Sequence, residues 1–143
     1  MSPHIPTQLA QEVRDRAHDA CEYCLLPQNS QEATFHIDHI VPRREGGDSH
    51  AANLALACVT CSLRKGARLT AIDPKSKSQV SLFHPREKTW SDHFRLNDEF
   101  EFEGLTPSGR ATISALGMNR PAIVSIRKEL HFIGRFPGMH RSE

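Results

Sequence analysis

The first twenty residues carry an apolar repeat with the spacing of an α-helix. The repeat consists of Leu9, Val13, Ala17 and Ala20, with charged residues between them. Side chains three or four positions apart share one face of a helix, so this repeat would bury one side and leave the other in water. Thr7 precedes the repeat and is a residue type that caps helix N-termini. We therefore predict a helix over residues 7–20.

The segment 34–41 has the composition and alternation of a β-strand. Its sequence, Thr-Phe-His-Ile-Asp-His-Ile-Val, is rich in β-branched and aromatic residues. A period of two places His36 and Asp38 on one face and His39 on the other. Asp38 and His39 can reach one site only if the strand ends or bulges there. Pro42 favours an end, because proline cannot continue a hydrogen-bonded ladder.

Shorter patterns predict the elements in the middle of the chain. Residues 45–48, Glu-Gly-Gly-Asp, are typical of a turn. A short helix is expected over residues 51–57, where it would carry Asn53, and a further helix from the second cysteine pair to about residue 67. After these we expect a loop at 73–78, a strand at 80–83 and a strand or hairpin over 94–105.

Two helices are predicted near the end of the chain. The first has Thr106 as its cap and Pro107 in its first turn, and Gly117 is its expected stop. The second is expected to begin with Asn119 as its cap and to place one apolar face inward, made of Ile123, Ile126, Leu130 and Ile133 and closed by Gly134. We predict that the two helices pack together as a structural cap.

Length and composition indicate one domain that would gain from an added source of stability. The chain has 143 residues, of which 38% are hydrophobic, and its mean hydropathy is −0.50. We expect a single domain over residues 1–143, with a core at 7–70 and an extension at 71–143. A bound metal would contribute appreciably to the stability of such a chain.

Charge is informative locally rather than overall. The formal net charge is only +1, which does not by itself indicate a nucleic-acid-binding protein. Basic residues nevertheless gather around the cysteine motifs, and they are Arg43, Arg44, Arg64, Lys65 and Arg68. We predict a basic site near the second cysteine pair, although each of these residues taken singly also fits a solvated surface charge.

Nothing in the chain resembles a membrane segment or a leader. Residues 1–20 lack an apolar run and carry charged side chains, and no later apolar run approaches the length that spans a bilayer. These features predict a cytoplasmic protein with no membrane partner. A reducing compartment favours metal ligation over disulfide formation by the cysteines.

All four cysteines of the chain occur in two Cys-x-x-Cys pairs, Cys21 with Cys24 and Cys58 with Cys61. Four thiolates are the ligand set of a closed, tetrahedral structural zinc site. Buried apolar cysteines and a redox pair are the competing interpretations, but two complete pairs favour zinc. A zinc ion with four protein ligands has no open position, so any catalysis needs a second site.

Asp38 and His39, between the two pairs, are the candidates for that second site. A carboxylate is a hard oxygen ligand that suits Mg²⁺ or Mn²⁺, and a neutral histidine can take a proton from water. A metal and a general base together suffice to hydrolyse a phosphodiester. The dipeptide alone is weak support, because a surface pair or a satisfied histidine is the commoner explanation.

The order of motifs over residues 21–68 resembles the HNH endonucleases. The shared features are Asp38-His39-Ile40-x-Pro42, then Gly46-Gly47, Asn53-Leu54 and Cys58-x-x-Cys61-x-x-x-Lys65-Gly66. This resemblance implies a small α+β fold, in which a four-cysteine zinc treble clef carries a ββα-metal core. An N-terminal helix, a C-terminal β-hairpin and two helices would complete it. Three motifs of the extension, at 82–86, 90–94 and 105–111, look like those of small bacterial HNH proteins.

The resemblance also implies roles for individual residues. Asp38 would bind the catalytic divalent ion, His39 would be the general base, and Asn53 would hold the His39 loop through its backbone. Asn53 also fits an ordinary turn residue. Ser62 stands where the family has His or Asn as a further metal ligand, and a hydroxyl is a weaker ligand. His36 is the leading substitute for it, ahead of His50, although a packed strand histidine explains His36 equally well.

Three functions follow from these observations. The first is a metal-dependent endonuclease that hydrolyses DNA of duplex, branched or single-stranded form, with structural Zn²⁺ and catalytic Mg²⁺ or Mn²⁺, and with phosphate contacts from the basic residues near the cysteines. The second is a non-catalytic, zinc-stabilised module that binds nucleic acid or protein, for which Ser62 is the main support. The third is a redox protein with reactive thiols. We favour the first, and we expect Trp90 to belong to the core rather than to stack on a base.

Overall fold

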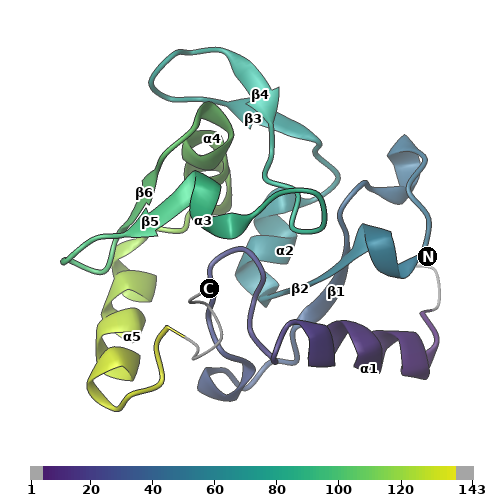
Figure 1. Ribbon diagram of the computed structural model, residues 1–143, viewed down its shortest axis with the longest axis horizontal. Coiled ribbons are helices and arrows are strands. Elements are labelled where there is room, and N and C mark those ends of the chain that lie inside the picture. The colour runs from purple at the N-terminus through teal and green to yellow at the C-terminus, as the bar shows by residue number, and fades with distance from the viewer. Residues whose placement is uncertain (1–4, 138–143) are drawn as a thin grey trace.

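The computed structural model describes residues 5–137, which contain five α-helices and three two-stranded antiparallel sheets. The first helix, α1 (Thr7–Arg16), ends earlier than its apolar repeat predicts (Figure 1). His18 and Asp19 have φ angles of 54° and 53°, and this left-handed backbone stops the helix. Ala17 and Ala20 are still buried, so the repeat identifies the inward face correctly.

The centre of the molecule has the order strand, strand, helix. Strand β1 (His36–His39) pairs antiparallel with β2 (Leu54–Ala57), with His36 opposite Ala57 and His39 opposite Leu54. The helix α2 (Val59–Lys65) follows and contacts both strands. The predicted β1 strand and α2 helix are confirmed, and the strand ends at His39 as Pro42 suggests.

The helix predicted over residues 51–57 is wrong. Only a single 3₁₀ turn, η3 (Ala51–Asn53), is present, and the rest of the segment is β2. All four residues of β2 are fully buried, because α1 and α2 also pack against this strand. A strand buried on both faces shows no alternation, and its Leu-Ala-Leu-Ala sequence has no β-branched residue. Burial therefore outweighs local propensity in this segment.

The extension contains one hairpin and one short helix more than the sequence predicts. The two hairpins are β3 (Thr70–Ile72) with β4 (Gln79–Ser81), joined by the predicted loop, and β5 (Phe94–Leu96) with β6 (Phe102–Gly104). A short helix, α3 (Trp90–His93), precedes β5. Two further 3₁₀ turns lie in the core, η1 (Gln28–Ser30) and η2 (Arg43–Glu45).

The helix α4 (Pro107–Leu116) joins the extension to the core. It contacts α2 of the core and three strands of the two hairpins, and it lies between them in Figure 1. Its ends are those that the sequence predicts. The Thr106 hydroxyl accepts a hydrogen bond from the Gly109 amide at 3.0 Å, and Gly117 ends the helix with a φ of 62°.

The last helix, α5 (Pro121–Phe132), departs from prediction at both ends. The residue before it, Arg120, is its N-cap, and Asn119 does not cap it. Instead the Asn119 amide forms hydrogen bonds of 2.7 and 2.8 Å with the backbone N–H and C=O of Phe102, and so prolongs the pairing of β6. Ile123 and Leu130 are buried as expected, whereas Ile133 is 65% exposed because the helix ends before it.

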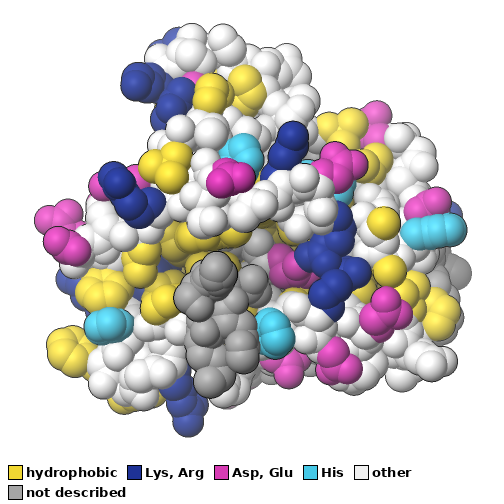
Figure 2. Space-filling model, viewed as in Figure 1, with side chains coloured by type: hydrophobic (Ala, Val, Ile, Leu, Met, Phe, Trp, Pro, Cys, Tyr) yellow, Lys and Arg dark blue, Asp and Glu magenta, His cyan; other side chains and the backbone are white. Residues whose placement is uncertain are grey.

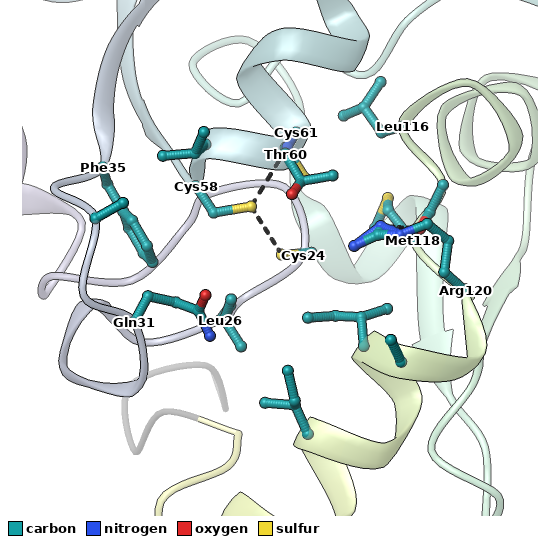
Figure 3. Close-up of a pocket in the computed structure, with 16 residues that line it drawn as sticks. Cys24, Leu26, Gln31, Phe35, Cys58, Thr60, Cys61, Leu116, Met118 and Arg120 are labelled. Carbon is teal, nitrogen blue, oxygen red and sulfur yellow. Dashed lines mark hydrogen bonds between the residues drawn. The ribbon is translucent and has the colours of Figure 1, made fainter.

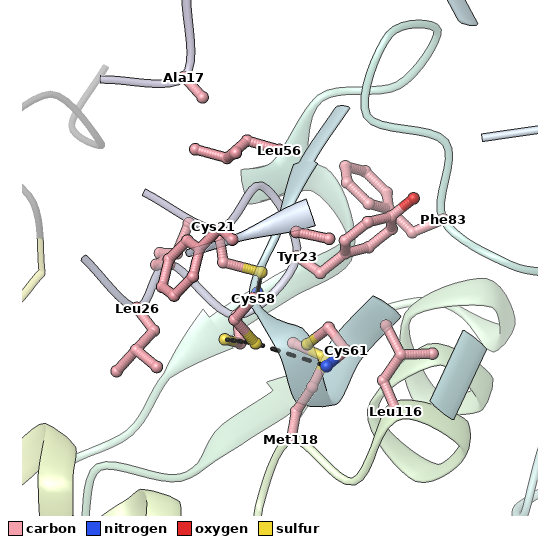
Figure 4. Close-up of a cluster of buried hydrophobic side chains, with 14 of the residues drawn as sticks. Ala17, Cys21, Tyr23, Leu26, Leu56, Cys58, Cys61, Phe83, Leu116 and Met118 are labelled. Atoms are coloured by element: carbon pink, nitrogen blue, oxygen red, sulfur yellow. Dashed lines mark hydrogen bonds between the residues drawn. The ribbon is translucent and has the colours of Figure 1, made fainter. Parts of the chain in front are cut away.

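One continuous apolar core runs from α1 to the C-terminal helices. It includes the four cysteines, Tyr23, Phe83 and Met118, so the cysteine cluster lies inside the core (Figure 4). Trp90 packs against Phe94 and Phe102 and donates a hydrogen bond of 2.8 Å to the Tyr23 carbonyl. The expectation that Trp90 belongs to the core is confirmed, and with it the prediction of a small α+β fold containing a four-cysteine metal site.

Candidate metal centre and candidate active site

The two cysteine pairs come together as one cluster. The four sulfur atoms lie within 4.8 Å of one another, and the Sγ atoms of Cys24 and Cys58 are 3.7 Å apart. Each pair forms a tight turn in which a backbone amide faces a sulfur, at 3.5 Å from Cys24 N to Cys21 Sγ and 3.4 Å from Cys61 N to Cys58 Sγ. Cys58 is also the N-cap of α2, where amide dipoles favour a negative charge.

The pKa values of three of the thiols are shifted strongly by their neighbours. Hydrogen bonds from the three neighbouring thiols lower the pKa of Cys58 far below that of an ordinary thiol. Hydrogen bonds to their neighbours, together with burial, raise the pKa of Cys24 and Cys61 well above it. The cluster by itself therefore keeps only part of its possible charge. A divalent ion among the sulfurs would offset half of the charge of four thiolates, and the donor set suits such an ion.

The C-terminal helices form one wall of this cluster. A pocket of about 120 Å³ lies between the cysteines and the corner where α4 leads into α5, and Figure 3 shows Leu116, Met118 and Arg120 facing it across from Cys24, Cys58 and Cys61. Met118 and Leu116 are buried. The extension therefore helps to enclose the metal site of the core.

Asp38 is a buried carboxylate whose two hydrogen-bond donors bind the same oxygen. The Tyr23 hydroxyl and the Lys65 ammonium each lie 3.2 Å from Oδ2. Asp38 is only 8% exposed, and burial raises its pKa, while Lys65 and then Tyr23 act in the opposite direction. The pair holds the carboxylate in a fixed orientation and leaves Oδ1 for another partner.

Lys65 lies inside the protein rather than on its surface. It is 2% exposed, and its ammonium binds the Asp38 carboxylate and donates a hydrogen bond of 3.0 Å to the His39 carbonyl. One cation thus fixes the side chain of Asp38 and the backbone of the next residue. The expected phosphate contact by Lys65 does not agree with this burial, because its charge is already used within the protein.

His39 is the last residue of β1, and its ring points toward a different set of groups from Asp38. Its Nε2 atom lies 2.9 Å from the Ser49 hydroxyl. Partial burial lowers the pKa of His39, the positive charge of Arg43 lowers it further, and Asp38 acts in the opposite direction. The ring is therefore neutral at pH 7 and able to accept a proton.

Asn53 fixes the loop that follows His39. Its Oδ1 accepts a hydrogen bond of 2.8 Å from Val41 N, and its Nδ2 donates to Val41 O at 3.1 Å and to Asp48 O at 2.8 Å. Gly47 completes this arrangement, because a Cβ atom there would lie 1.7 Å from Val41 O. Only glycine allows the loop to approach so closely.

Ser62 and His36 contact each other across α2 and β1. The Ser62 hydroxyl lies 2.9 Å from Nδ1 of His36. His50 lies on an exposed loop, where it pairs weakly with Asp48 at 3.7 Å. Among residues 5–137, the four cysteines are the only group of three or more His, Cys, Asp or Glu side chains that fits a metal ion. A second ion near Asp38 would therefore keep several water ligands.

The remaining basic residues of the predicted site are exposed. These are Arg43 and Arg44 in the loop after β1, Arg64 near the end of α2, and Arg68 just beyond it. The Arg68 guanidinium is held by the Arg64 carbonyl at 2.7 Å. On the face shown in Figure 2, Lys and Arg side chains form small groups among Asp and Glu side chains, with no continuous basic surface.

A groove of about 340 Å³ separates the core from the extension. Ile40, Val41, Lys65 and Arg68 line its core side, and the other side is lined by Ser81, Leu82, Phe83, His84, Glu87 and Lys88. One of its lining residues, Ile40, directly follows His39 in the chain, and another, Arg68, is exposed. Lys65, whose ammonium contacts Asp38, also lines the groove, whereas Asp38 and His39 are not among its lining residues.

Two buried residues of this region, Glu22 and Tyr23, have no signal in the sequence beyond their position inside the first Cys-x-x-Cys pair. The Glu22 carboxylate accepts a hydrogen bond of 2.9 Å from Leu56 N and forms an ion pair with Arg86 of the extension. The Tyr23 hydroxyl binds Asp38. The partners of both residues are distant in sequence and are visible only in the folded chain.

Residues 21–68 match the family model described as HNH endonuclease. This match confirms the resemblance expected from the motifs, and the segment contains all four cysteines, Asp38, His39, Asn53 and Ser62. The match indicates nuclease or nucleic-acid-binding function, with a nucleic acid as the class of substrate. Neither the curated proteins nor the solved structures that we searched gave a match. Among the described helices, none is long and apolar enough to span a membrane.

Proposed function

Because residues 21–68 match the HNH endonucleases, we propose that this protein is a metal-dependent nuclease that hydrolyses phosphodiester bonds in DNA. The observation that carries the proposal is the arrangement at the end of β1. There a buried, oriented carboxylate and a neutral histidine are neighbours in the chain, and the loop after them is fixed by Asn53. A hydrolytic site needs both groups held in place.

His39 is the general base in this proposal. A base must be largely unprotonated at working pH and must reach a hydroxyl or water at hydrogen-bond distance. Burial and Arg43 lower the pKa of His39, which meets the first condition. The contact of 2.9 Å between Nε2 and Ser49 Oγ supports the second, since it shows that a hydroxyl fits against this nitrogen. A water in such a position would pass its proton to the ring.

Asp38 is the proposed ligand of the catalytic divalent ion, Mg²⁺ or Mn²⁺. Such an ion, when bound, neutralises charge on the phosphate and on the leaving oxygen. Tyr23 and Lys65 contribute by holding Oδ2, so that the carboxylate does not have to be ordered when an ion binds. Lys65 also binds the His39 carbonyl and so sets the position of the ligand relative to the base.

The exposed arginines Arg43, Arg44, Arg64 and Arg68 are the proposed phosphate contacts. They flank the end of β1 and the end of α2, which are the two elements that hold Asp38 and His39 in place. Contacts of this kind position a nucleic acid without reading its bases, so we expect little sequence preference. Lys65 is not among them, because it is buried.

The ion in the cysteine cluster is proposed to be Zn²⁺ with a structural role. Four thiolates are its usual closed ligand set, and the cluster lies in the apolar core. We further propose that the core (7–70) and the extension (71–143) fold as a single domain. The pair of Glu22 with Arg86 and the bond from Trp90 to Tyr23 support this, since both link the first cysteine pair to the extension.

The proposal is tested by cleavage of supercoiled plasmid, single-stranded DNA and RNA in Mg²⁺ or Mn²⁺. His39→Ala is expected to reduce the cleavage rate at least about 100-fold, which is typical for the loss of a general base. His50→Ala is the matched control, because His50 is an exposed loop histidine and its removal should leave the rate unchanged.

Zinc content and the melting temperature of both variants must equal those of the wild type. Equal cleavage by His39→Ala would exclude His39 as the base. DNA binding without cleavage in any divalent ion would instead identify the protein as a non-catalytic binding module.

A further inference from the structure

Two polar contacts join strand β1 to helix α2. His36 meets Ser62 at 2.9 Å, and Asp38 meets Lys65 at 3.2 Å. The two β1 residues are two positions apart and so share one face of the strand, and the two α2 residues are three positions apart and share one face of the helix. His36 and Asp38 therefore both point into the space between β1 and α2.

The Asp38 side of this space is ready to accept a cation. Both donors to Asp38 bind Oδ2, and the carboxylate is 8% exposed. A buried carboxylate with one oxygen held by two donors has its second oxygen in a defined direction. Oδ1 takes part in neither contact and is the ligand atom that Asp38 offers.

The His36 side carries the arrangement that metal-binding histidines show. A ligating histidine generally donates the N–H of its other ring nitrogen to an oxygen, and this contact fixes both the tautomer and the ring. Ser62 Oγ lies 2.9 Å from Nδ1 of His36 and is such an oxygen. With the proton on Nδ1, the lone pair of Nε2 is available to a metal.

We propose that His36, through Nε2, is the second protein ligand of the divalent ion bound by Asp38, and that Ser62 is a positioning residue that orients the His36 ring. The inference rests on the proposed nuclease function and deepens it. It reverses the roles expected from the family pattern, in which the residue after the last cysteine binds the ion directly. The contact between His36 and Ser62 uses the serine hydroxyl to hold the ring, and a hydroxyl is itself a weak metal ligand.

The choice of ligand has a consequence for metal preference. Imidazole nitrogen binds transition metals better than it binds Mg²⁺, which prefers oxygen ligands alone. A site made of His36 and Asp38 is therefore expected to bind Mn²⁺, Co²⁺ or Ni²⁺ more tightly than Mg²⁺. Replacing His36 by an oxygen ligand should remove much of that preference.

The test measures Mn²⁺ binding to the zinc-loaded full chain by electron paramagnetic resonance, with no nucleic acid present. We expect Asp38→Asn and His36→Ala each to weaken Mn²⁺ binding at least about 10-fold, and Ser62→Ala to weaken it less, since the ligands remain. His36→Asp should retain Mn²⁺ binding but lose the preference for Ni²⁺ over Mg²⁺. His50→Ala is the control and should bind as the wild type does.

Nuclear magnetic resonance of the imidazole nitrogens gives an independent readout. Nδ1 of His36 should be protonated in the wild type, and Mn²⁺ should broaden the His36 ring signals. Zinc content and melting temperature show whether each variant is folded, and His36→Gln, which keeps a polar side chain of similar reach, replaces His36→Ala if that variant does not fold.

Ser62→Ala weakening Mn²⁺ binding as much as Asp38→Asn, with folded His36 variants binding normally, would overturn the inference. Wild-type protein that fails to bind Mn²⁺ would overturn it as well. Binding that depends on His36 in a protein that cleaves no nucleic acid would support the inference and reject the nuclease. Cleavage that persists in folded His36→Ala would reject the inference and support the nuclease.

Discussion

The cysteine cluster and the Asp38–His39 site lie in the same matched segment, yet they are built in different ways. The cluster consists of four identical side chains from two short turns, and each turn forms its own amide-to-sulfur contact. At the second site, every group is held by a residue from elsewhere, with Tyr23 and Lys65 on Asp38 and Ser49 on His39. The spacing of the cysteines in the chain is enough to predict the cysteine cluster. The proposed hydrolytic site depends instead on tertiary contacts, some of which come from the turn of the first cysteine pair.

Removal of the proposed Zn²⁺ from the cysteine cluster should have the largest effect, because both regions depend on it. Zinc chelation is expected to cost roughly 10 kcal/mol or more of folding free energy, because binding and folding are coupled in small zinc domains. Both regions should then lose structure together. The measurement is circular dichroism during heating, with the zinc content determined in the same sample. A melt that stays unchanged after confirmed zinc removal would show that the cluster does not support the fold.

Lys65→Met should have the next largest effect, because it leaves the buried Asp38 without its cation. Breaking a buried ion pair typically costs about 3 to 5 kcal/mol, and we expect that loss near neutral pH. Burial raises the pKa of Asp38 in the folded protein, and loss of Lys65 raises it further. The folded state then holds a proton that the unfolded state releases above about pH 4, so the stability of the variant falls as pH rises through this window.

Urea unfolding at pH 5 and pH 8 measures this effect. The stability difference between Lys65→Met and the wild type should be greater at pH 8. Arg64→Met is the matched control on the same helix, since Arg64 is exposed and its loss should be almost neutral at both pH values. A pH-independent difference would mean that Lys65 contributes through packing alone.

Asn53→Ala should destabilise the protein less and act mainly on the loop of the proposed active site that follows His39. Three hydrogen bonds to Val41 and Asp48 are lost, and part of their contribution is recovered from water, so about 1 to 3 kcal/mol is expected. Cleavage should fall further than stability predicts, because the loop after His39 loses its anchor.

Asn97→Ala offers the comparison for this variant. The Asn97 side chain holds a turn of the extension through bonds of 2.9 Å to the amides of Glu99 and Glu101, far along the chain from His39. It should lower the melting temperature without slowing cleavage. If the two variants slowed cleavage equally, Asn53 would have no special role at the site.

The smallest predicted effect concerns the pH dependence of cleavage. Because the pKa of His39 is lowered, the acidic limb of kcat/KM should have its midpoint below pH 6.5. Arg43→Gln removes a positive charge that contributes to the lowering, so the midpoint should move up toward pH 6.5. Arg44→Gln, the neighbouring change, should leave the midpoint in place. If the midpoint of the acidic limb were the same in Arg43→Gln as in the wild type, the titrating group would not be His39.

Much of the fold could be predicted wherever a local signal decides the structure. The helix α4 follows from Thr106, Pro107 and Gly117, and the cluster follows from the cysteine spacing alone. The strand β2 could not be predicted, because burial on both faces removes the alternation that marks a strand. The role of Asn119 could not be predicted for a similar reason. Its preferred partner, the backbone of Phe102, is distant in sequence.

The candidate site shows the same division. Asp38 and His39 can be selected from their motif, and Asn53 from its place in the family pattern. The burial of Lys65 and the contact of Tyr23 with Asp38 depend on how α2 and the first cysteine turn pack on β1. A basic residue in a motif carries no mark of whether it will face solvent or a carboxylate.

The position of Tyr23 between Cys21 and Cys24 links the metal cluster to the Asp38 site and to the extension. Its hydroxyl donates a hydrogen bond to Asp38, and its carbonyl accepts one from the Trp90 ring. Its backbone belongs to the turn that carries two of the four cysteines. Any event that disorders this turn, such as oxidation of a thiol, withdraws a donor from Asp38 in a single step. Oxidation of the cysteines should therefore reduce the activity of the proposed site, although Asp38 and His39 themselves are not modified.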